Sequence, residues 1–298
     1  MAVLITGGCG FIGSHITDLF IENDYEVIIV DDFSSGTKNF LNEKAKIYQL
    51  DIQSKNVEDI FKENTIDYVI HLAAQASVSV SNKNPIFDAC TNIVGSLNLI
   101  ELSKKYNVKK FIVASTAAVY GMPEYLPVDE KHPVNPMSNY GLSKLTMEKY
   151  LILSNLDYII FRYSNVYGPR QNPHGEAGVI SIFLDKMKRQ EFIEIHGDGE
   201  QTRDFIFVQD IARANLLAIQ SNIKNEIFNI STCTKISINE LFYKMKSILN
   251  SNSQVIHTNE RSGDIKHSTL DNSKAKTILD WQPMIKLEEG LEQLFNQK

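Results

Sequence analysis

Short apolar runs alternate with longer amphipathic segments along the first half of the chain. The runs are rich in Val and Ile and are of strand length. They predict strands over residues 2–6, 26–31, 46–51, 67–72, 110–115 and 158–163. The segments between them predict helices over residues 11–23, 57–63, 85–106 and 140–154.

Several of these runs are apolar at every position, as in Val27-Ile28-Ile29-Val30. Such runs are typical of parallel strands that helices cover on both faces. Strands and helices that alternate in this way predict right-handed crossovers. We therefore expect an α/β fold built on a doubly wound parallel sheet.

The pattern changes after residue 163. Residues 164–178 contain Asn, Gly, Pro and His and predict a loop. Further helices are expected near residues 179–190, 208–220, 237–250, 273–280 and 287–296. We expect a first domain over residues 1–165, to which the chain returns around 205–232, and a smaller, mostly helical domain over residues 166–298.

Composition excludes several classes of function. The chain has 298 residues, 43% of them hydrophobic, and a formal charge of −6, which argues against nucleic-acid and membrane-surface binding. Cys9, Cys90 and Cys233 form no C-x-x-C pair, so we expect no disulfide framework and a cytoplasmic location. We also expect no signal peptide, no transmembrane segment and no metal site.

The first strand leads directly into a glycine triad, Gly7, Gly10 and Gly13. Alone, such a triad is equally well an ordinary glycine-rich turn. Here a helix follows it, and its free N–H groups and positive dipole end suit a pyrophosphate. The second strand ends in Asp31-Asp32, and an acid there binds the ribose hydroxyls of NAD and repels the extra phosphate of NADP. The sequence therefore predicts an NAD site.

Two further strand ends belong to this prediction. Asp51 ends the third strand, where it could meet the adenine edge or serve only as a loop acid. His71 and Leu72 end the fourth strand and precede Ala73 and Ala74. These small residues would let a nicotinamide lie near the sheet, although simple strand packing explains them equally well.

Tyr140 and Lys144 have the spacing Y-x-x-x-K, which places both on one face of a helix. The ammonium group would lower the pKa of the phenol, which could then act as a base. Tyr106 and Lys110 have the same spacing but precede a strand, at the wrong end of the sheet for a ligand. Tyr140 follows the carboxyl end of that strand, where Ser115 and Thr116 add hydroxyls that could also be simple turn caps.

These residues resemble the extended short-chain dehydrogenase/reductase family, and most of all its UDP-galactose 4-epimerase-like branch with a Rossmann-type sheet. The resemblance covers essentially the whole chain. It depends on the motifs GGCGFIG at 7–13, DDFSSG at 31–36, HLAAQ at 71–75, STAAVYG at 115–121, NYGLSK at 139–144, RYSNVYGPRQ at 162–171, GDGEQTRDF at 197–205 and RSGD at 261–264.

The resemblance implies a role for each matching residue. Tyr140 would be the base, Lys144 its partner and Thr116 the hydroxyl that binds O4 of the sugar. The residues that would contact NAD are Gly7, Gly10, Phe11, Ile12, Gly13, Asp31, Asp32, Ser35, Gly36, Asp51, Ile52, Leu72, Ala73, Ala74, Gln75, Asn92 and Ser115, with Tyr140 and Lys144. The residues that would contact a UDP-sugar are Thr116, Tyr140, Asn165, Val179, His196, Arg203, Arg261, Asp264 and Ser268.

Some of these residues also have simpler interpretations. Without the resemblance, Arg203 beside Asp204 would equally be a surface ion pair, and His196 a solvent-facing side chain beside a glycine turn. Ser164 stands where the family commonly has Phe, which puts the shape of the sugar pocket in doubt.

The resemblance implies a redox-neutral 4-epimerisation through a 4-keto sugar. Related dehydratases carry Asp-Glu after the catalytic Thr and related decarboxylases carry Ser-Glu, whereas this chain has Ala117-Ala118. Neither alanine can move a proton, which favours epimerisation. Ser268 stands where a bulky Tyr would exclude N-acetylated sugars, so we expect UDP-N-acetylglucosamine to be accepted as well as UDP-glucose.

The alternatives are a UDP-uronic acid 4-epimerase, another dehydratase, decarboxylase or reductase of the family, and a non-catalytic NAD sensor. A sensor typically lacks the Tyr or the Lys, and both are present here. The resemblance also implies a homodimer, in which the helices near 85–106 and 140–154 of two copies form a four-helix bundle.

Overall fold

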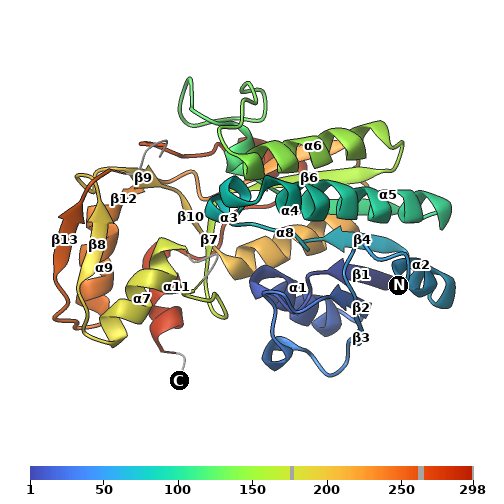
Figure 1. The fold of residues 1–298 in the computed structure, drawn as a ribbon, viewed down its shortest axis with the longest axis horizontal. Helices are drawn as coiled ribbons and strands as arrows, with labels where there is room; N and C mark the ends of the chain where they lie inside the picture. Colours follow the sequence, from blue (N-terminus) through green and yellow to red (C-terminus); the bar gives the residue numbers. More distant parts are fainter. Residues whose placement is uncertain (175–177, 261–264, 297–298) are drawn as a thin grey trace.

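The computed structural model describes residues 1–174, 178–260 and 265–296. Its centre is a seven-stranded sheet with the order β11-β6-β5-β4-β1-β2-β3, in which every neighbouring pair is parallel (Figure 1). The strands are β1 (Ala2–Thr6), β2 (Glu26–Asp31), β3 (Lys46–Gln49), β4 (Tyr68–His71), β5 (Lys110–Thr116), β6 (Tyr158–Tyr163) and β11 (Glu226–Ile230). The predicted doubly wound α/β fold is confirmed.

Successive residues of a strand point to opposite sides of the sheet, and here both sets are apolar, so helices cover both faces. Val3 and Ile5 of β1 belong to one apolar core, with α1 (Phe11–Glu22) and α8 (Val208–Gln220). Leu4 belongs to a second core, on the other face of the sheet. The helices that contribute to this second core are α2 (Val57–Glu63), α5 (Ser96–Lys105) and α6 (Asn139–Leu153). The unbroken apolar runs thus have the double burial that their sequence predicts.

Three local features differ from the prediction. The expected helix over 85–106 consists of α4 (Pro85–Ala89), a π-helical turn (Cys90–Gly95) and α5. The short helix α3 (Val78–Lys83) was not predicted, and its N-cap residue Ser77 accepts a hydrogen bond from Val80 N–H. The expected loop over 164–178 contains a short strand, β7 (Asn165–Tyr167), which pairs with β10 (Phe205–Phe207).

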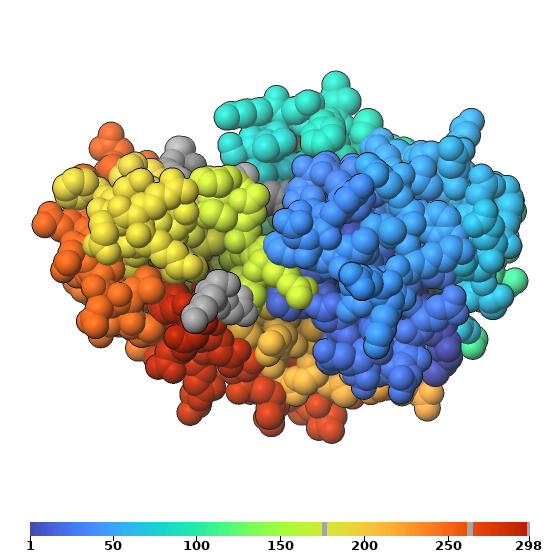
Figure 2. Space-filling model, turned by 90° about the horizontal axis from the view of Figure 1, so that it is seen from below, coloured from blue at the N-terminus to red at the C-terminus, as the bar shows by residue number. Residues whose placement is uncertain are grey.

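The C-terminal part has helices and also three two-stranded sheets. Its helices are α7 (Val179–Lys188), α9 (Ile238–Ile248) and α11 (Leu287–Phe295), which share one apolar core. Besides β7–β10, the strand pairs are β8 (Ile193–His196) with β13 (Val255–Thr258) and β9 (Thr202–Arg203) with β12 (Ile236–Ser237). In Figure 2 residues near 190, in yellow, and residues near 250, in orange, lie at the opposite end of the molecule from the blue N-terminal residues.

The chain crosses back to the main sheet more than once. Helix α8 packs in the same core as α1, and β11 forms the edge of the sheet beside β6. Helix α10 (Ser273–Ile278) follows later, and the buried Trp281 after it donates from its indole N–H to Asp210 O at 3.0 Å. The division at residue 165 stays a prediction.

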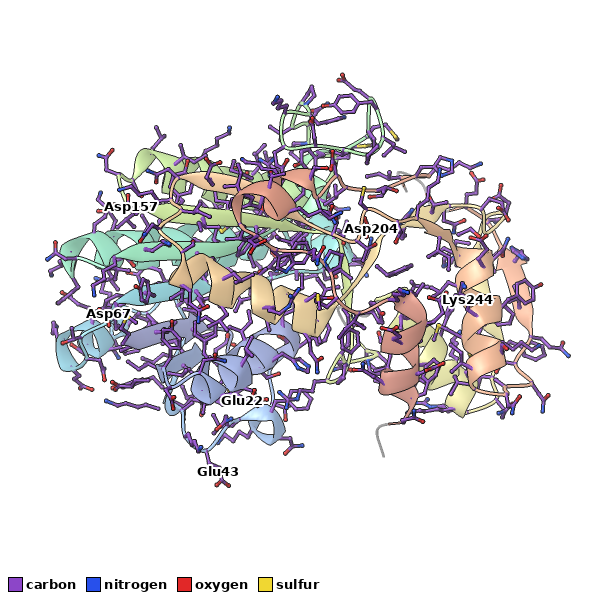
Figure 3. The ribbon with its side chains drawn as sticks, turned by 180° about the vertical axis from the view of Figure 1, so that it is seen from behind. Glu22, Glu43, Asp67, Asp157, Asp204 and Lys244 are labelled. Atoms are coloured by element: carbon purple, nitrogen blue, oxygen red, sulfur yellow. The ribbon has the colours of Figure 1, made fainter. Side chains whose placement is uncertain are left out.

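Asp204 lies where the main sheet meets the C-terminal part (Figure 3). Its side chain is 1% exposed, and its carboxylate accepts hydrogen bonds from Thr232 N–H at 3.0 Å and Cys233 N–H at 3.1 Å. The hydroxyls of Thr232 and Ser164 donate to it at 2.7 and 3.5 Å. Burial outweighs these bonds and raises the pKa of Asp204 to about 6. The alternative interpretation of Arg203 and Asp204 as a surface ion pair is therefore wrong, because this carboxylate lies inside the protein.

This raised pKa predicts a dependence of stability on pH. The folded state binds the Asp204 proton more tightly than the unfolded chain, so the stabilisation is complete below the ordinary aspartate pKa of 3.8 and is lost as pH rises through about 6. Relative to Asp204→Asn, wild type should lose about 3 kcal/mol of unfolding free energy between pH 3.5 and pH 7. Urea unfolding of both proteins at the two pH values measures this difference. Equal pH dependence in the two proteins would contradict the prediction.

Candidate active site

The glycine loop after β1 lies against the loop after β4, where the strand order reverses. Gly7 has φ +70°, and a Cβ on it would lie 2.8 Å from Ala73 N. A Cβ on Gly13, in the first turn of α1, would lie 2.1 Å from Gly7 O. Gly10 is the N-cap of α1 and places no side-chain cap over the first N–H groups of that helix. This cradle and the N-terminus of α1, which includes Phe11 and Ile12, fit the pyrophosphate of NAD.

Asp31 ties the glycine loop to the segment after β2. Its carboxylate accepts from Cys9 N–H at 2.9 Å and from Phe33 N–H at 2.8 Å. Burial raises the pKa of Asp31, while these two N–H bonds oppose the rise. Each carboxylate oxygen keeps a lone pair for a ribose hydroxyl. Asp32 is exposed and accepts from Ser34 N–H and the Ser34 hydroxyl through one oxygen, Oδ1, and a ribose contact of either acid stays a prediction.

The remaining adenosine-side residues lie on two loops. Ser35 is exposed, and a Cβ on its neighbour Gly36 would lie 3.0 Å from the Asp31 carboxylate. Asp51 is exposed and accepts from Gln53 N–H at 2.8 Å, as a loop acid does, whereas Ile52 is buried. A contact of these residues with NAD stays a prediction.

Gln75 and Asn92 hold the loop after β4 through a reciprocal pair of hydrogen bonds. Gln75 N–H donates to Asn92 Oδ1 and Asn92 Nδ2 donates to Gln75 O, both at 2.9 Å. The buried carboxylate of Asp88 accepts from Gln75 Nε2 at 2.7 Å and lies 3.2 Å from Asn92 Nδ2. Asn92 thus fixes the segment of Leu72, Ala73 and Ala74 beside the glycine loop, and its direct contact with NAD stays a prediction.

Tyr140 and Lys144 lie at the start of α6, at the carboxyl end of β5. A Cβ on Gly141 would lie 2.7 Å from Ala118 O, so glycine lets α6 approach the turn after Thr116. Lys144 is 2% exposed. The burial of His71 lowers the pKa of that imidazole to about 3, and the positive charge of Lys144 is a second, smaller cause. Thr116 Oγ accepts from Ala118 N–H at 3.1 Å and keeps its own proton for a ligand. These residues suit proton transfer with a sugar hydroxyl.

The second Y-x-x-x-K pair lies at the other end of the sheet. Lys110 donates to Ala218 O and Ser221 O at 2.7 and 2.8 Å, and Tyr106 donates to Glu58 at 3.0 Å. Both side chains therefore hold structural contacts.

Ser115 forms a hydrogen bond to a buried ion pair behind the site. Its hydroxyl donates to Glu148 of α6, which Arg162 of β6 binds with two N–H groups at 2.6 and 3.0 Å. Glu148 and Arg162 are both buried, and the Arg162 guanidinium lies 4.8 Å from the Tyr120 ring centre. The Ser115 hydroxyl is thus engaged in the core, and its predicted contact with NAD stays a prediction.

A cavity of about 190 Å³ lies at the C-terminal end of β7, on the expected substrate side. Asn165 and Val179 line it with two residues that were not predicted, Gln171 and Phe205. Gln171 Oε1 is a buried acceptor with no hydrogen-bond partner in the described part of the chain. Only its place after the NVYGPR segment could have indicated Gln171 from sequence.

Two other predicted substrate residues meet around Thr202. Its carbonyl accepts from Arg203 Nη1 at 2.9 Å and from Ser268 N–H at 3.2 Å. His196 contacts Thr258 Oγ1 through Nδ1 at 2.9 Å, so this ring is tied to β13. The predictions for Arg261 and Asp264 lie outside the described residues.

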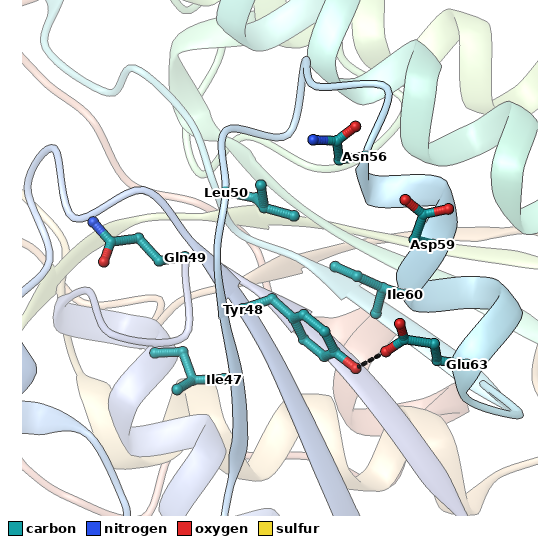
Figure 4. A pocket seen from close by; sticks show the side chains of 8 residues that line it. All are labelled: Ile47, Tyr48, Gln49, Leu50, Asn56, Asp59, Ile60 and Glu63. Carbon is teal, nitrogen blue, oxygen red and sulfur yellow. Dashed lines mark hydrogen bonds between the residues drawn. The ribbon is translucent and has the colours of Figure 1, made fainter.

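A wider hollow of about 490 Å³ lies between β3 and α2, away from these residues (Figure 4). Tyr48 donates to Glu63 across it at 2.8 Å, and none of the predicted site residues lines it. Within residues 1–174, 178–260 and 265–296, no group of three metal-binding side chains occurs and no helix is long and apolar enough to cross a membrane.

Known proteins resemble this chain over its whole length. A putative UDP-glucose 4-epimerase of Methanocaldococcus jannaschii is 48% identical over 299 residues, covering 99% of this chain and 97% of that protein. The crystal structure of UDP-glucose 4-epimerase with UDP-glucose from Thermotoga maritima superposes with a TM-score of 0.96 at 46% identity, covering 99% of this chain and 97% of that one. A UDP-N-acetylglucosamine 4-epimerase of Methanobrevibacter ruminantium, in complex with UDP-N-acetylmuramic acid, has a TM-score of 0.93 at 40% identity, with coverages of 98% and 96%.

The family model for NAD-dependent epimerases and dehydratases matches residues 3–231, which include the glycine cradle, Asp31 and the Tyr140–Lys144 pair. The chain therefore belongs to the NAD-dependent epimerase/dehydratase family.

Proposed function

We propose that this chain is a UDP-sugar 4-epimerase that interconverts UDP-glucose and UDP-galactose and also accepts their N-acetylated counterparts. The observation that carries the proposal is the pair of alanines that follows β5. Thr116 ends β5, Ala117 and Ala118 come directly after it, and Tyr140 lies at the start of α6. Elimination of water needs an additional acid and base at this place, and neither alanine can supply one. The UDP-glucose and UDP-N-acetylglucosamine epimerases described above support the substrate class.

Tyr140 serves as the base for the 4-hydroxyl of the sugar, and Thr116 donates its free proton to O4. Buried Lys144 stabilises the phenolate, because a cation four residues along the helix favours the charged form. Asp31 and the glycine cradle would hold NAD, which would supply the hydride acceptor for C4 and the hydride donor to the other face of the 4-keto sugar.

The remaining substrate residues hold the UDP moiety. Arg203 and Arg261 suit a diphosphate, because the guanidinium fork matches its oxygens. Asn165 and Val179 line the cavity beside β7 and accommodate the nucleoside with His196, while Asp264 completes the set. Anchoring through UDP lets the sugar rotate while the intermediate stays in the site.

Replacement of Tyr140 by Phe tests the proposed reaction. We expect Tyr140→Phe to lower kcat about 10²- to 10⁴-fold, because the base is lost, and to retain bound NAD. Purified protein is incubated separately with UDP-glucose, UDP-N-acetylglucosamine and UDP-glucuronate, and the 4-epimers are resolved by chromatography.

Tyr106→Phe is the matched control, because it removes the phenol of the other Y-x-x-x-K pair at the far end of the sheet. It should leave kcat unchanged. Equal activity in Tyr140→Phe and wild type would overturn the assignment of the base. Turnover of UDP-glucuronate alone would make the enzyme a uronic-acid epimerase, and a 4-keto or decarboxylated product would refute epimerisation.

Ser268 predicts the breadth of sugar specificity. This residue is half-buried beside Thr202 and Arg203, and its small side chain leaves room for an N-acetyl group. Ser268→Tyr should lower kcat/KM for UDP-N-acetylglucosamine at least about 10-fold relative to UDP-glucose, and Ser268→Ala should preserve the ratio. An unchanged ratio in Ser268→Tyr would show that another position limits the pocket.

We also propose a homodimer through α4, α5 and α6. Large apolar side chains on α4, the π-helical turn and α6 are exposed, namely Ile86 at 76%, Val94 at 52%, Leu142 at 53% and Leu153 at 77%. Apolar residues gathered on two adjacent helices are typical of an interface between subunits.

Leu153→Glu should shift the purified protein from dimer to monomer in light scattering, because a carboxylate in an apolar interface is desolvated. Tyr243→Glu is the control, since Tyr243 is 66% exposed on α9, in the C-terminal part. A monomeric wild type would disprove the dimer.

A further inference from the structure

His71, the last residue of β4, joins three elements of the site in the interior. The imidazole is 1% exposed. Its Nδ1 lies 2.7 Å from Thr6 Oγ1, at the end of β1, and its Nε2 lies 2.8 Å from Ser96 Oγ, at the start of α5. Thr6 and Ser96 are also buried. The proposed reaction uses none of these three side chains.

The hydrogen bonds around His71 fix which ring nitrogen carries the proton. Ser96 Oγ donates its only proton to Asn92 O at 2.6 Å, so it accepts from His71 Nε2–H. The neutral ring then has no proton on Nδ1, which accepts from the Thr6 hydroxyl. Thr6 Oγ in turn accepts from Ala73 N–H at 3.2 Å, a proton shared with Thr6 O at 3.1 Å. We assign the Nε2–H tautomer on this basis.

This chain of hydrogen bonds continues to the proposed base. Asn92, whose carbonyl accepts from Ser96, also donates from Nδ2 to Ser143 Oγ at 3.1 Å. Ser143 Oγ donates to Tyr140 O at 3.0 Å. Asn92 and Ser143 are both buried. The buried relay therefore runs from the backbone of Ala73, in the loop expected beside the nicotinamide, to the backbone of Tyr140.

We propose that His71 is a positioning residue, which holds the Ala73 loop and the first turn of α6 at a fixed spacing. The inference rests on the proposed roles of Tyr140 and of the Ala73 loop. Proton removal from the 4-hydroxyl and hydride transfer from C4 need both groups in place together, and a displacement near 1 Å costs about 10²-fold in rate. Neutral His71 also adds no second positive charge beside Lys144.

Variants at the two ends of the imidazole test the relay. Ser96→Ala and Thr6→Val each remove one hydrogen-bond partner, and each should lower kcat about 10-fold and raise the NAD dissociation constant by a similar factor. The KM for the UDP-sugar should stay within about twofold, because UDP is anchored elsewhere. Thr6→Ser restores the hydroxyl and should restore kcat. His71→Leu breaks both ends and should lower kcat about 100-fold.

Two buried hydroxyls provide matched controls. Ser103 lies on α5 with Ser96, Thr17 lies on α1, and neither hydroxyl has a hydrogen-bond partner among the residues that the structure describes. Ser103→Ala and Thr17→Val should leave kcat and NAD affinity at wild-type values. If Ser96→Ala and Thr6→Val behave like these controls, the proposal is overturned.

A third measurement is independent of turnover. Long-range ¹H–¹⁵N NMR of the imidazoles, assigned by comparison with His71→Asn, should show His71 neutral with its proton on Nε2 from pH 5 to pH 9. A proton on Nδ1, or titration in this range, would refute the relay. If wild type binds NAD but converts no UDP-sugar, the proposed function fails alone. The NMR spectrum and the NAD affinities of the variants then decide about His71.

Discussion

The close approach of two backbone segments, at the carboxyl ends of β1 and β4, is the constraint on which the rest of the structure depends. Gly7 lies against Ala73, and Gly13 lies against Gly7, at distances that exclude a side chain. This approach occurs where the strand order reverses, and there the diverging loops of a doubly wound sheet leave room for a ligand. The same contact places the loop after β4 within reach of Thr6 and His71. The glycine cradle and the hydrogen-bonded relay thus both depend on this one close approach of the backbone at Gly7 and Ala73.

Buried polar groups hold the elements around this contact in register. Glu148 and Arg162 join α6 to β6, Asp88 joins α4 to the Ala73 loop through Gln75, and Asp204 joins the two parts of the chain. Such groups are expensive to bury, and each therefore has several hydrogen bonds in a fixed geometry. Apolar packing would tolerate small shifts between these elements, whereas a carboxylate with several donors does not. The site is consequently oriented by polar contacts and stabilised by the apolar cores on both faces of the sheet.

The sequence allowed the strands, the glycine cradle and the Tyr140–Lys144 pair to be predicted, because each depends on a local pattern. Apolar runs identify buried strands, and parallel strands bring their carboxyl ends to one edge. The π-helical turn at Asn92 could not be predicted, because it accompanies a contact of Asn92 with Gln75, which lies 17 residues away in sequence. The short strand β7 and the interior position of Asp204 depend on β10 and on Thr232, which are distant in sequence. Residue types at strand ends thus indicate which groups take part, while long-range pairing determines what each one contacts.

A 4-epimerase differs from its relatives in what it must avoid. Once the 4-keto sugar forms, an acid or base beside C5 would promote elimination, so a site that returns the same hydride benefits from inert neighbours. In the proposed reaction Ala117 and Ala118 would be such neighbours, and Gly141 lets α6 approach Ala118 O directly. A single proton-transfer group then serves both epimers, and its distance from the cofactor loop must suit two orientations of the sugar. A rigid buried connection between that group and the loop meets this demand, whereas a flexible one would favour one epimer and release the intermediate. Ala117 and Ala118 and the polar relay through His71 would therefore both serve the return of the hydride without elimination.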